Sequence, residues 1–152
     1  MNFSLFSVCL LATIVPIFGK PLEEDEIKAI ARQLIEQCKE KAGASDSDIE
    51  ALKEKKLPET HEGLCMLECV FETSQIMPDG KFSKDGMITA FEPMMNEQDA
   101  DTIENGKKLA ETCANEIGDG DDDKCITAKM VVECIVKHAP SHGFAIPEPH
   151  AA

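Results

Sequence analysis

Residues 59–75, ETHEGLCMLECVFETSQ, decide the fold of this chain, because their apolar residues predict a helix that carries two cysteines four residues apart. Cys65 and Cys69 then lie on one helix face with nearly parallel Cα–Cβ bonds, so each reaches another element more easily than it reaches its neighbour. A turn at residues 78–80, PDG, follows the helix, since proline and glycine set turn geometry. If both cysteines are oxidised, this helix is cross-linked to two other parts of the chain.

The first 19 residues, MNFSLFSVCLLATIVPIFG, contain no charged side chain and an apolar run too short to span a bilayer. This pattern predicts a secretory signal peptide over residues 1–19 and an extracellular mature protein. Cleavage after Gly19 removes Cys9 and leaves six of the seven cysteines. An even number of cysteines in a small exported domain predicts three disulfides.

The composition is strongly acidic but ordinary in its hydrophobic content. The 152 residues include 15 Lys plus Arg and 29 Asp plus Glu, for a formal net charge of −14, and 43% of them are hydrophobic. Such a charge disfavours binding to nucleic acid or to anionic membrane surfaces. The hydrophobic content is sufficient for a folded core. We therefore predict one acidic globular domain with no nucleic-acid partner.

Apolar residues spaced three or four apart, separated by caps and breakers, predict five further helices. They are expected over residues 22–42, from Ser45 or Ser47 to Pro58, from Ser83 or Asp85 through Met94, from Asn96 or Asp99 to Gly118, and over residues 122–138. Sustained alternation of apolar and polar residues is absent from the sequence, so no strand is predicted. The expected fold is a compact all-α domain of six helices over residues 20–139, followed by a non-helical tail over residues 140–152.

Helix geometry restricts how the six mature cysteines can pair. Six cysteines allow fifteen pairings. Cys65 and Cys69 are unsuited to each other, and Cys125 and Cys134 lie about 13 Å apart along one predicted helix, beyond the roughly 7 Å that a disulfide spans. Excluding every pairing that contains Cys65–Cys69 or Cys125–Cys134 leaves ten of the fifteen. The residues alone do not select among the ten.

Two arrangements of side chains suggest metal binding but fit it poorly. His61, Cys65 and Cys69 share one face of the central helix, yet cysteines in an exported protein meet an oxidant before they meet zinc. The acidic turn that starts at Asp119 resembles the beginning of a calcium loop. However, Met130 stands at the loop position where a bidentate Glu is required. We predict no metal and no cofactor.

The sequence also lacks the patterns of a hydrolase. It contains no G-x-S-x-G motif, and no His and Asp have the spacing of a secreted phospholipase loop. Cysteines held in disulfides do not act as nucleophiles. We therefore predict that the protein is not an enzyme and has no catalytic residue.

The spacing of the six cysteines resembles that of the insect odorant-binding proteins. The intervals are 26, 3, 43, 11 and 8 residues between Cys38, Cys65, Cys69, Cys113, Cys125 and Cys134. The intervals of 3 and 8 residues are the ones that distinguish this six-cysteine family, and the resemblance covers essentially all of the mature chain. It implies the disulfides Cys38–Cys69, Cys65–Cys125 and Cys113–Cys134, which form one of the ten pairings that helix geometry leaves.

The same resemblance implies a function. Members of the family are secreted carriers that hold small hydrophobic molecules, such as odorants and other semiochemicals, in an apolar cavity. The implied partners are a small hydrophobic ligand and a membrane chemoreceptor, and the implied state is a monomer or a weak homodimer. Two rivals remain open: a saposin-like lipid-interacting protein, whose cysteines group differently, and a signalling helical bundle whose core is completely filled.

The residues expected to line such a cavity lie on the inward faces of the predicted helices. Taken singly, each is better explained by core packing, and only the set as a whole suggests a ligand site. The candidate ligand-binding residues are Leu34, Leu67, Phe71, Ser74, Ile76, Phe82, Ile88, Phe91, Met94, Leu109, Val131, Ile135 and Phe144. Ser74 is included with its neighbour Thr73 because the chain has no Tyr or Trp to hydrogen-bond a ligand. Phe144 lies in the tail, for which two alternatives remain open: a lid folded across the cavity, or a disordered segment.

Overall fold

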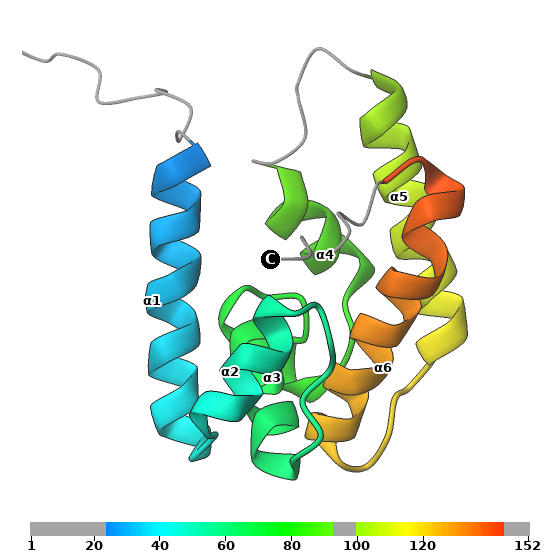
Figure 1. Ribbon diagram of the computed structural model, residues 1–152. Helices are drawn as coiled ribbons and strands as arrows, with labels where there is room; N and C mark the ends of the chain where they lie inside the picture. Colours follow the sequence, from blue (N-terminus) through cyan, green and yellow to red (C-terminus); the bar gives the residue numbers. More distant parts are fainter. Residues whose placement is uncertain (1–23, 93–99, 145–152) are drawn as a thin grey trace, which may run out of the picture.

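The protein is described by a computed structural model over residues 24–92 and 100–144. Within these residues the chain forms six α-helices and two 3-10 helices and has no strand (Figure 1). The elements are α1 (Glu24–Ala42), α2 (Asp46–Lys53), α3 (His61–Thr73), η1 (Pro78–Gly80), α4 (Lys84–Phe91), α5 (Ala100–Ile117), α6 (Lys124–His138) and η3 (Ala139–His142). The predicted all-α class with six helices is confirmed, and no helix in the described ranges has the length and apolar character that a bilayer requires.

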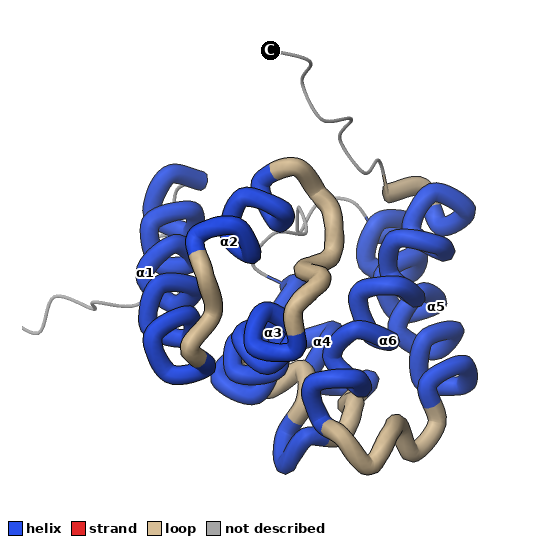
Figure 2. The backbone as a smooth tube through the Cα atoms, turned by 60° about the horizontal axis from the view of Figure 1, so that its bottom comes forward, coloured by secondary structure: helices blue, strands red, loops and turns tan. Residues whose placement is uncertain are grey.

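The third helix lies at the centre of the arrangement, with α1 on one side and α6 on the other (Figure 2). α5 packs against α6, and α4 packs against α5. Leu64 and Leu67 of α3 face one cluster of apolar side chains, whereas Met66 and Cys69 face another. Because apolar residues surround most of α3, the helix is covered on two sides.

These two clusters are the cores of the molecule. The main core lies among α3, α4, α5 and α6, and its buried members are Leu64, Leu67, Ile76, Met77, Met87, Leu109, Ala110, Cys113, Ile117, Ala128, Val131, Cys134 and Ala139. The small core joins α1 and α2 to α3 around Cys38, Met66 and Cys69. The main core is therefore the place where most helices meet.

The residues of α1 that belong to the small core lie in its second half. Leu34 and Ile35 contact the small core, but Ile30, one turn earlier on the same predicted apolar stripe, is 56% exposed. The amphipathic pattern of residues 22–42 predicted the helix correctly. It did not indicate how much of the apolar stripe is covered.

A buried carboxylate joins the starts of α2 and α3. Asp48 is 3% exposed, and it accepts hydrogen bonds from the backbone N–H of Ser45 at 2.9 Å and from the Ser45 hydroxyl at 2.6 Å. The hydroxyl of Thr60 donates to the second Asp48 oxygen at 2.7 Å. Ser45 and Thr60 are the N-caps of α2 and α3. The Asp48 side chain therefore fixes the two helix starts relative to each other.

The C-terminal boundary of helical structure differs from the expectation. A non-helical tail was expected from Pro140, but residues 139–142 form η3, one further turn after α6. Proline is accepted in the first turn of a helix because its missing N–H has no partner there. Gly143, with a φ of 81°, ends the turn, so the irregular segment begins three residues later than predicted. Residues 145–152 lie outside the described part of the chain.

We expect Asp48→Ala to lower the free energy of unfolding by about 2 kcal/mol, because Ser45 and Thr60 then lose a shared buried acceptor. Urea denaturation followed by circular dichroism measures the change. Asp46→Ala is the matched control, since Asp46 lies in the same turn of α2 but is exposed and pairs only with Lys39, which should contribute less than about 1 kcal/mol. Equal losses in the two variants would contradict this role of Asp48.

The same carboxylate should make stability depend on pH. The pKa of Asp48 is held below its usual range mainly by the hydrogen bond from the Ser45 hydroxyl. Hydrogen bonds from the Ser45 backbone and from the side chain and backbone of Thr60 add to this effect. A lowered pKa stabilises the folded chain above the pKa of the unfolded chain, and this contribution is lost as pH falls through the folded pKa. The difference in stability between the unmodified protein and Asp48→Ala should therefore shrink below about pH 4.

Candidate functional site

Three disulfides connect the helices, one of them in the small core. Cys38–Cys69 joins α1 to α3, Cys65–Cys125 joins α3 to α6, and Cys113–Cys134 joins α5 to α6, with Cα–Cα distances of 5.6, 4.5 and 5.7 Å. These are the pairs that the family resemblance implies. The central helix thus carries two cross-links that diverge from adjacent turns, as the spacing of residues 65 and 69 indicates.

Ten of the thirteen candidate ligand-binding residues meet at the main core. The buried ones among them are Leu67, Ile76, Leu109 and Val131. The partly buried ones are Phe71, Phe82, Ile88, Phe91, Ile135 and Phe144. Together they come from α3, from the connection between α3 and α4, from α4, α5 and α6, and from the residue that follows Gly143. Distant parts of the sequence are therefore brought together, as a ligand site would require.

The three remaining candidates are placed differently. Leu34 contacts the small core and not the main core. Met94 lies in residues 93–99, outside the described part of the chain. The Ser74 hydroxyl donates to the backbone carbonyl of Val70 at 2.8 Å, and that of Thr73 donates to the carbonyl of Cys69 at 2.8 Å. Both hydroxyl protons are used within α3, which leaves the oxygen of Ser74 available only as an acceptor.

The aromatic members of the site are less completely packed than the aliphatic ones. Four phenylalanines, Phe71, Phe82, Phe91 and Phe144, contact the main core yet remain partly exposed. By contrast, Leu109 is 5% exposed and Val131 is fully buried. All four phenylalanines of the site are therefore partly accessible, and such rings make adaptable contacts with apolar molecules.

The buried side chains of the main core are uncharged. Among the described residues, Asp48 and Thr127 are the only buried polar or charged side chains. Asp48 belongs to the helix caps described above, and the Thr127 hydroxyl accepts from the backbone N–H of Asp121 at 2.9 Å. No buried side-chain nitrogen or oxygen in this part of the chain lacks a partner. The buried side chains of the main core in the described residues are therefore apolar, or hydrogen-bonded within the protein.

One core residue of α4 was missed by sequence reasoning. The predicted stripe on this helix runs through Ile88, Phe91 and Met94, but Met87 is the buried residue at 3% exposure, and Ile88 is only partly buried. Met87 and Phe91 are also spaced four apart, so the pattern of so short a helix fits two neighbouring stripes equally well. A longer helix would have distinguished them.

The position of α4 is set by a close approach to the end of α3. A Cβ atom on Gly86 would lie 1.8 Å from the backbone oxygen of Gln75, so only glycine fits there. Ser83 caps α4 by accepting from the Gly86 N–H at 3.0 Å, and the Ser83 N–H donates to the Ile76 carbonyl at 2.8 Å. These contacts hold Phe91 and its helix against the main core.

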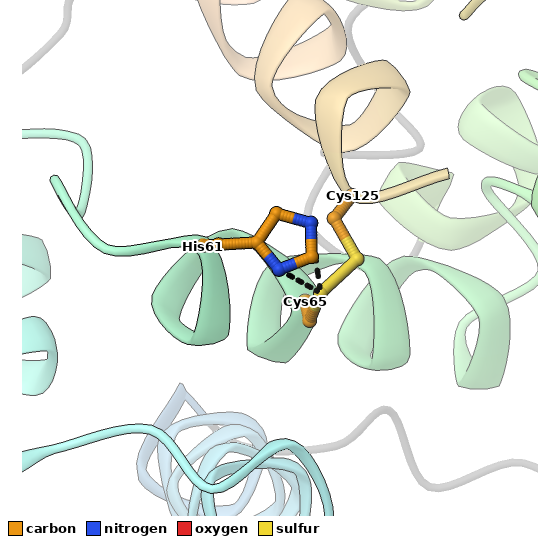
Figure 3. Close-up of side chains that lie close together, drawn as sticks. All are labelled: His61, Cys65 and Cys125. Carbon is orange, nitrogen blue, oxygen red and sulfur yellow. Dashed lines mark hydrogen bonds between the residues drawn. A yellow bond between two sulfur atoms is a disulfide. The ribbon is translucent and has the colours of Figure 1, made fainter. Parts of the chain in front are cut away.

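The side chains considered for zinc are arranged as a disulfide and a neighbouring ring. His61 lies beside Cys65, as Figure 3 shows, but the Cys65 sulfur is bonded to Cys125 and the Cys69 sulfur to Cys38. Zinc binds cysteine as a thiolate, which an oxidised cysteine does not provide.

Comparison with known proteins connects this geometry to a family. The sequence model of the PBP/GOBP family matches residues 22–138. General odorant-binding protein 19d of Drosophila melanogaster is 33% identical over 142 residues, which cover 93% of this chain and 89% of that protein.

Solved structures of insect proteins have the same fold. Odorant-binding protein dmelOBP28a from Drosophila melanogaster aligns over 81% of this chain and 100% of its own with a TM-score of 0.65 and 23% identity. Odorant binding protein 5 of Apis mellifera covers 84% of this chain and 100% of its own, with a TM-score of 0.66 and 20% identity. The fatty acid binding protein OBP56a from the oral disk of the blowfly Phormia regina covers 81% of this chain and 99% of its own, with a TM-score of 0.59 and 18% identity.

We expect Gly86→Ala to lower the free energy of unfolding by about 2 kcal/mol, because the added methyl group forces α4 away from the end of α3. Denaturation followed by circular dichroism tests this. Thr89→Ala, on the exposed face of the same helix, serves as the control and should change stability by less than about 0.5 kcal/mol. A Gly86→Ala protein as stable as the control would show that α4 does not depend on this close approach.

Proposed function

Because the chain belongs to the PBP/GOBP family, we propose that it is a secreted carrier of small hydrophobic molecules, which it holds in the main core and transports through aqueous extracellular fluid. Odorants and related semiochemicals are the proposed cargo. The family consists of carriers and not of enzymes, and the proposal involves no catalytic step.

One observation carries this proposal: four phenylalanines contact the main core without being fully packed. An apolar molecule placed against these rings removes its own surface and theirs from water, which contributes roughly 25 cal/mol for each Å² buried. The three disulfides support such a site because they stabilise the folded chain by restricting its unfolded state. A carrier needs both an apolar site and a fold that stays intact when no ligand is bound.

The proposed lining of the site consists of the ten candidates that meet at the main core. Ser74 is proposed to accept a hydrogen bond from a ligand hydroxyl, since its own proton is donated to Val70. Phe144 contacts the main core just after η3 and is proposed as part of the lining, whereas residues 145–152, the rest of the tail considered as a lid, lie outside the described part of the chain. Leu34 is not proposed as a lining residue, because it belongs to the small core.

The charge of the surroundings favours neutral cargo. No Lys, Arg or His side chain is buried in the described residues, so a carboxylate ligand would have no buried cation to pair with there. The net charge of −14 also opposes the approach of anions. We therefore propose neutral alcohols, esters and aldehydes as the preferred class, although one structural neighbour is named as a fatty acid binding protein.

We propose that residues 1–19 are a signal peptide and that the mature protein acts outside the cell. A membrane chemoreceptor is the proposed destination of the cargo. Protein recovered from the medium of a eukaryotic secretion host should begin at residue 20, as intact-mass measurement would show.

We expect the oxidised mature protein to take up the apolar fluorophore N-phenyl-1-naphthylamine and to release it to neutral medium-chain alcohols. Phe71→Ala and Phe91→Ala should each weaken uptake about tenfold, because each removes a ring from the site. Val136→Ala is the control, since Val136 is 50% exposed on α6 and should leave uptake unchanged.

Circular dichroism of each variant establishes that the helices remain. A folded, oxidised protein that takes up neither the fluorophore nor the alcohols would contradict the proposed carrier. Binding to a receptor without any uptake would instead identify a signalling bundle with a filled core.

A further inference from the structure

The Cys65–Cys125 disulfide has a special place in the fold. The Cys38–Cys69 and Cys113–Cys134 bonds each join one pair of neighbouring helices, α1 with α3 and α5 with α6. Among the described residues, Cys65–Cys125 is the only cross-link between these two helix pairs. Opening it would leave two separately cross-linked pairs, α1 with α3 and α5 with α6. These pairs would be held to each other by packing and by the intervening chain.

This bond is also more accessible than the other two. Cys65 and Cys125 are both partly exposed. The cysteines of the other two disulfides, Cys38, Cys69, Cys113 and Cys134, are at most 6% exposed. Since thiol–disulfide exchange requires a thiolate to reach a sulfur atom, access favours reaction at Cys65–Cys125.

A histidine and a carboxylate lie next to the bond. The His61 ring points toward the disulfide (Figure 3), and its Nδ1 lies 3.6 Å from the Cys65 sulfur. Its Nε2 lies 2.7 Å from a carboxylate oxygen of Asp123. The other Asp123 oxygen accepts from the Cys125 N–H at 2.8 Å, because Asp123 is the N-cap of α6. The carboxylate thus orients the ring toward the sulfur.

We propose that Cys65–Cys125 is a thiol-exchange site for low-molecular-weight thiols of the glutathione class. The thiolate of the small thiol attacks the Cys125 sulfur and forms a mixed disulfide. The bond to Cys65 breaks, its electron pair passes to the Cys65 sulfur, and Nδ1 of His61, 3.6 Å from that sulfur, stabilises the leaving thiolate when it carries a proton. A second small thiolate then attacks the small-thiol sulfur of the mixed disulfide, which releases the Cys125 thiolate and one oxidised small disulfide.

The electrons balance, since two small thiols are oxidised as one protein disulfide is reduced. The leaving sulfur is Cys65 because His61 Nδ1 lies beside it, and a thiolate that accepts a hydrogen bond leaves more readily than one without such a partner. His61 acts on the leaving sulfur itself, and Asp123 is the residue that positions the His61 ring.

Exchange at this site would regulate the proposed carrier, and this consequence rests on the proposed function. α3 contributes Leu64 and Leu67 to the main core, and α6 contributes Ala128 and Val131. Opening the bond between these helices removes the covalent restraint across the site, so bound cargo should dissociate faster.

The test uses the oxidised chain recovered from a secretion host, incubated with reduced glutathione, quenched with acid, and alkylated with N-ethylmaleimide for peptide mapping. We expect alkylated Cys65 and glutathionylated Cys125 to form about tenfold faster than any product from the other disulfides. His61→Ala should slow this step about tenfold. His138→Ala is the matched control, because His138 also pairs with a carboxylate, Glu116 at 2.7 Å, but lies beside the buried Cys134.

Equal rates at the three disulfides, first reaction at a buried one, or an unchanged rate in His61→Ala would each overturn the exchange site. If His61→Ala loses helical content, His61→Gln supplies the same comparison in a ring-free but polar variant.

Loading the protein with N-phenyl-1-naphthylamine before the reaction distinguishes failure of the regulatory proposal from failure of the proposed carrier function. Retention of the fluorophore after selective opening contradicts the regulatory consequence, whereas failure to load it contradicts the carrier and leaves the exchange rates measurable.

Discussion

Two cysteines one helical turn apart on α3 constrain the rest of the structure. Cys69 fixes α1 on one side of the helix, and Cys65 fixes α6 on the other. Cys113–Cys134 then ties α5 to α6. Cross-links of this kind stabilise a small domain by restricting its unfolded state, independently of how tightly its interior is packed. A domain held in this way can keep partly uncovered phenylalanines at its main core and still remain folded.

Local sequence pattern was sufficient for the helices and for most of their ends. The caps at Ser45 and Ser83 and the turn at residues 78–80 are recognisable because each satisfies or interrupts backbone hydrogen bonds within a few residues. The cysteine pairs are different, because pairing over long separations depends on how helices pack. Helix geometry left ten pairings, and only the resemblance to a family selected one.

The same limit applies to the candidate site. Periodicity shows which side chains share a helix face, but it does not show which helix covers that face, so Leu34 was assigned to the site although it contacts the small core. On α4, Met87 is buried where Ile88 was expected to be. After α6, Pro140 begins a further turn because its missing N–H is harmless there. These differences all arise from packing and context beyond the local pattern.

The acidic surface, the neutral main core and the covalent frame together suit a protein that keeps an apolar molecule in solution. The most direct test is a crystal structure of the oxidised protein grown with a medium-chain alcohol. We expect electron density for the alcohol enclosed among Phe71, Phe91, Leu109 and Val131, with its chain against the rings. A solid interior, with density for the alcohol only on the outer surface or nowhere, would contradict the carrier function.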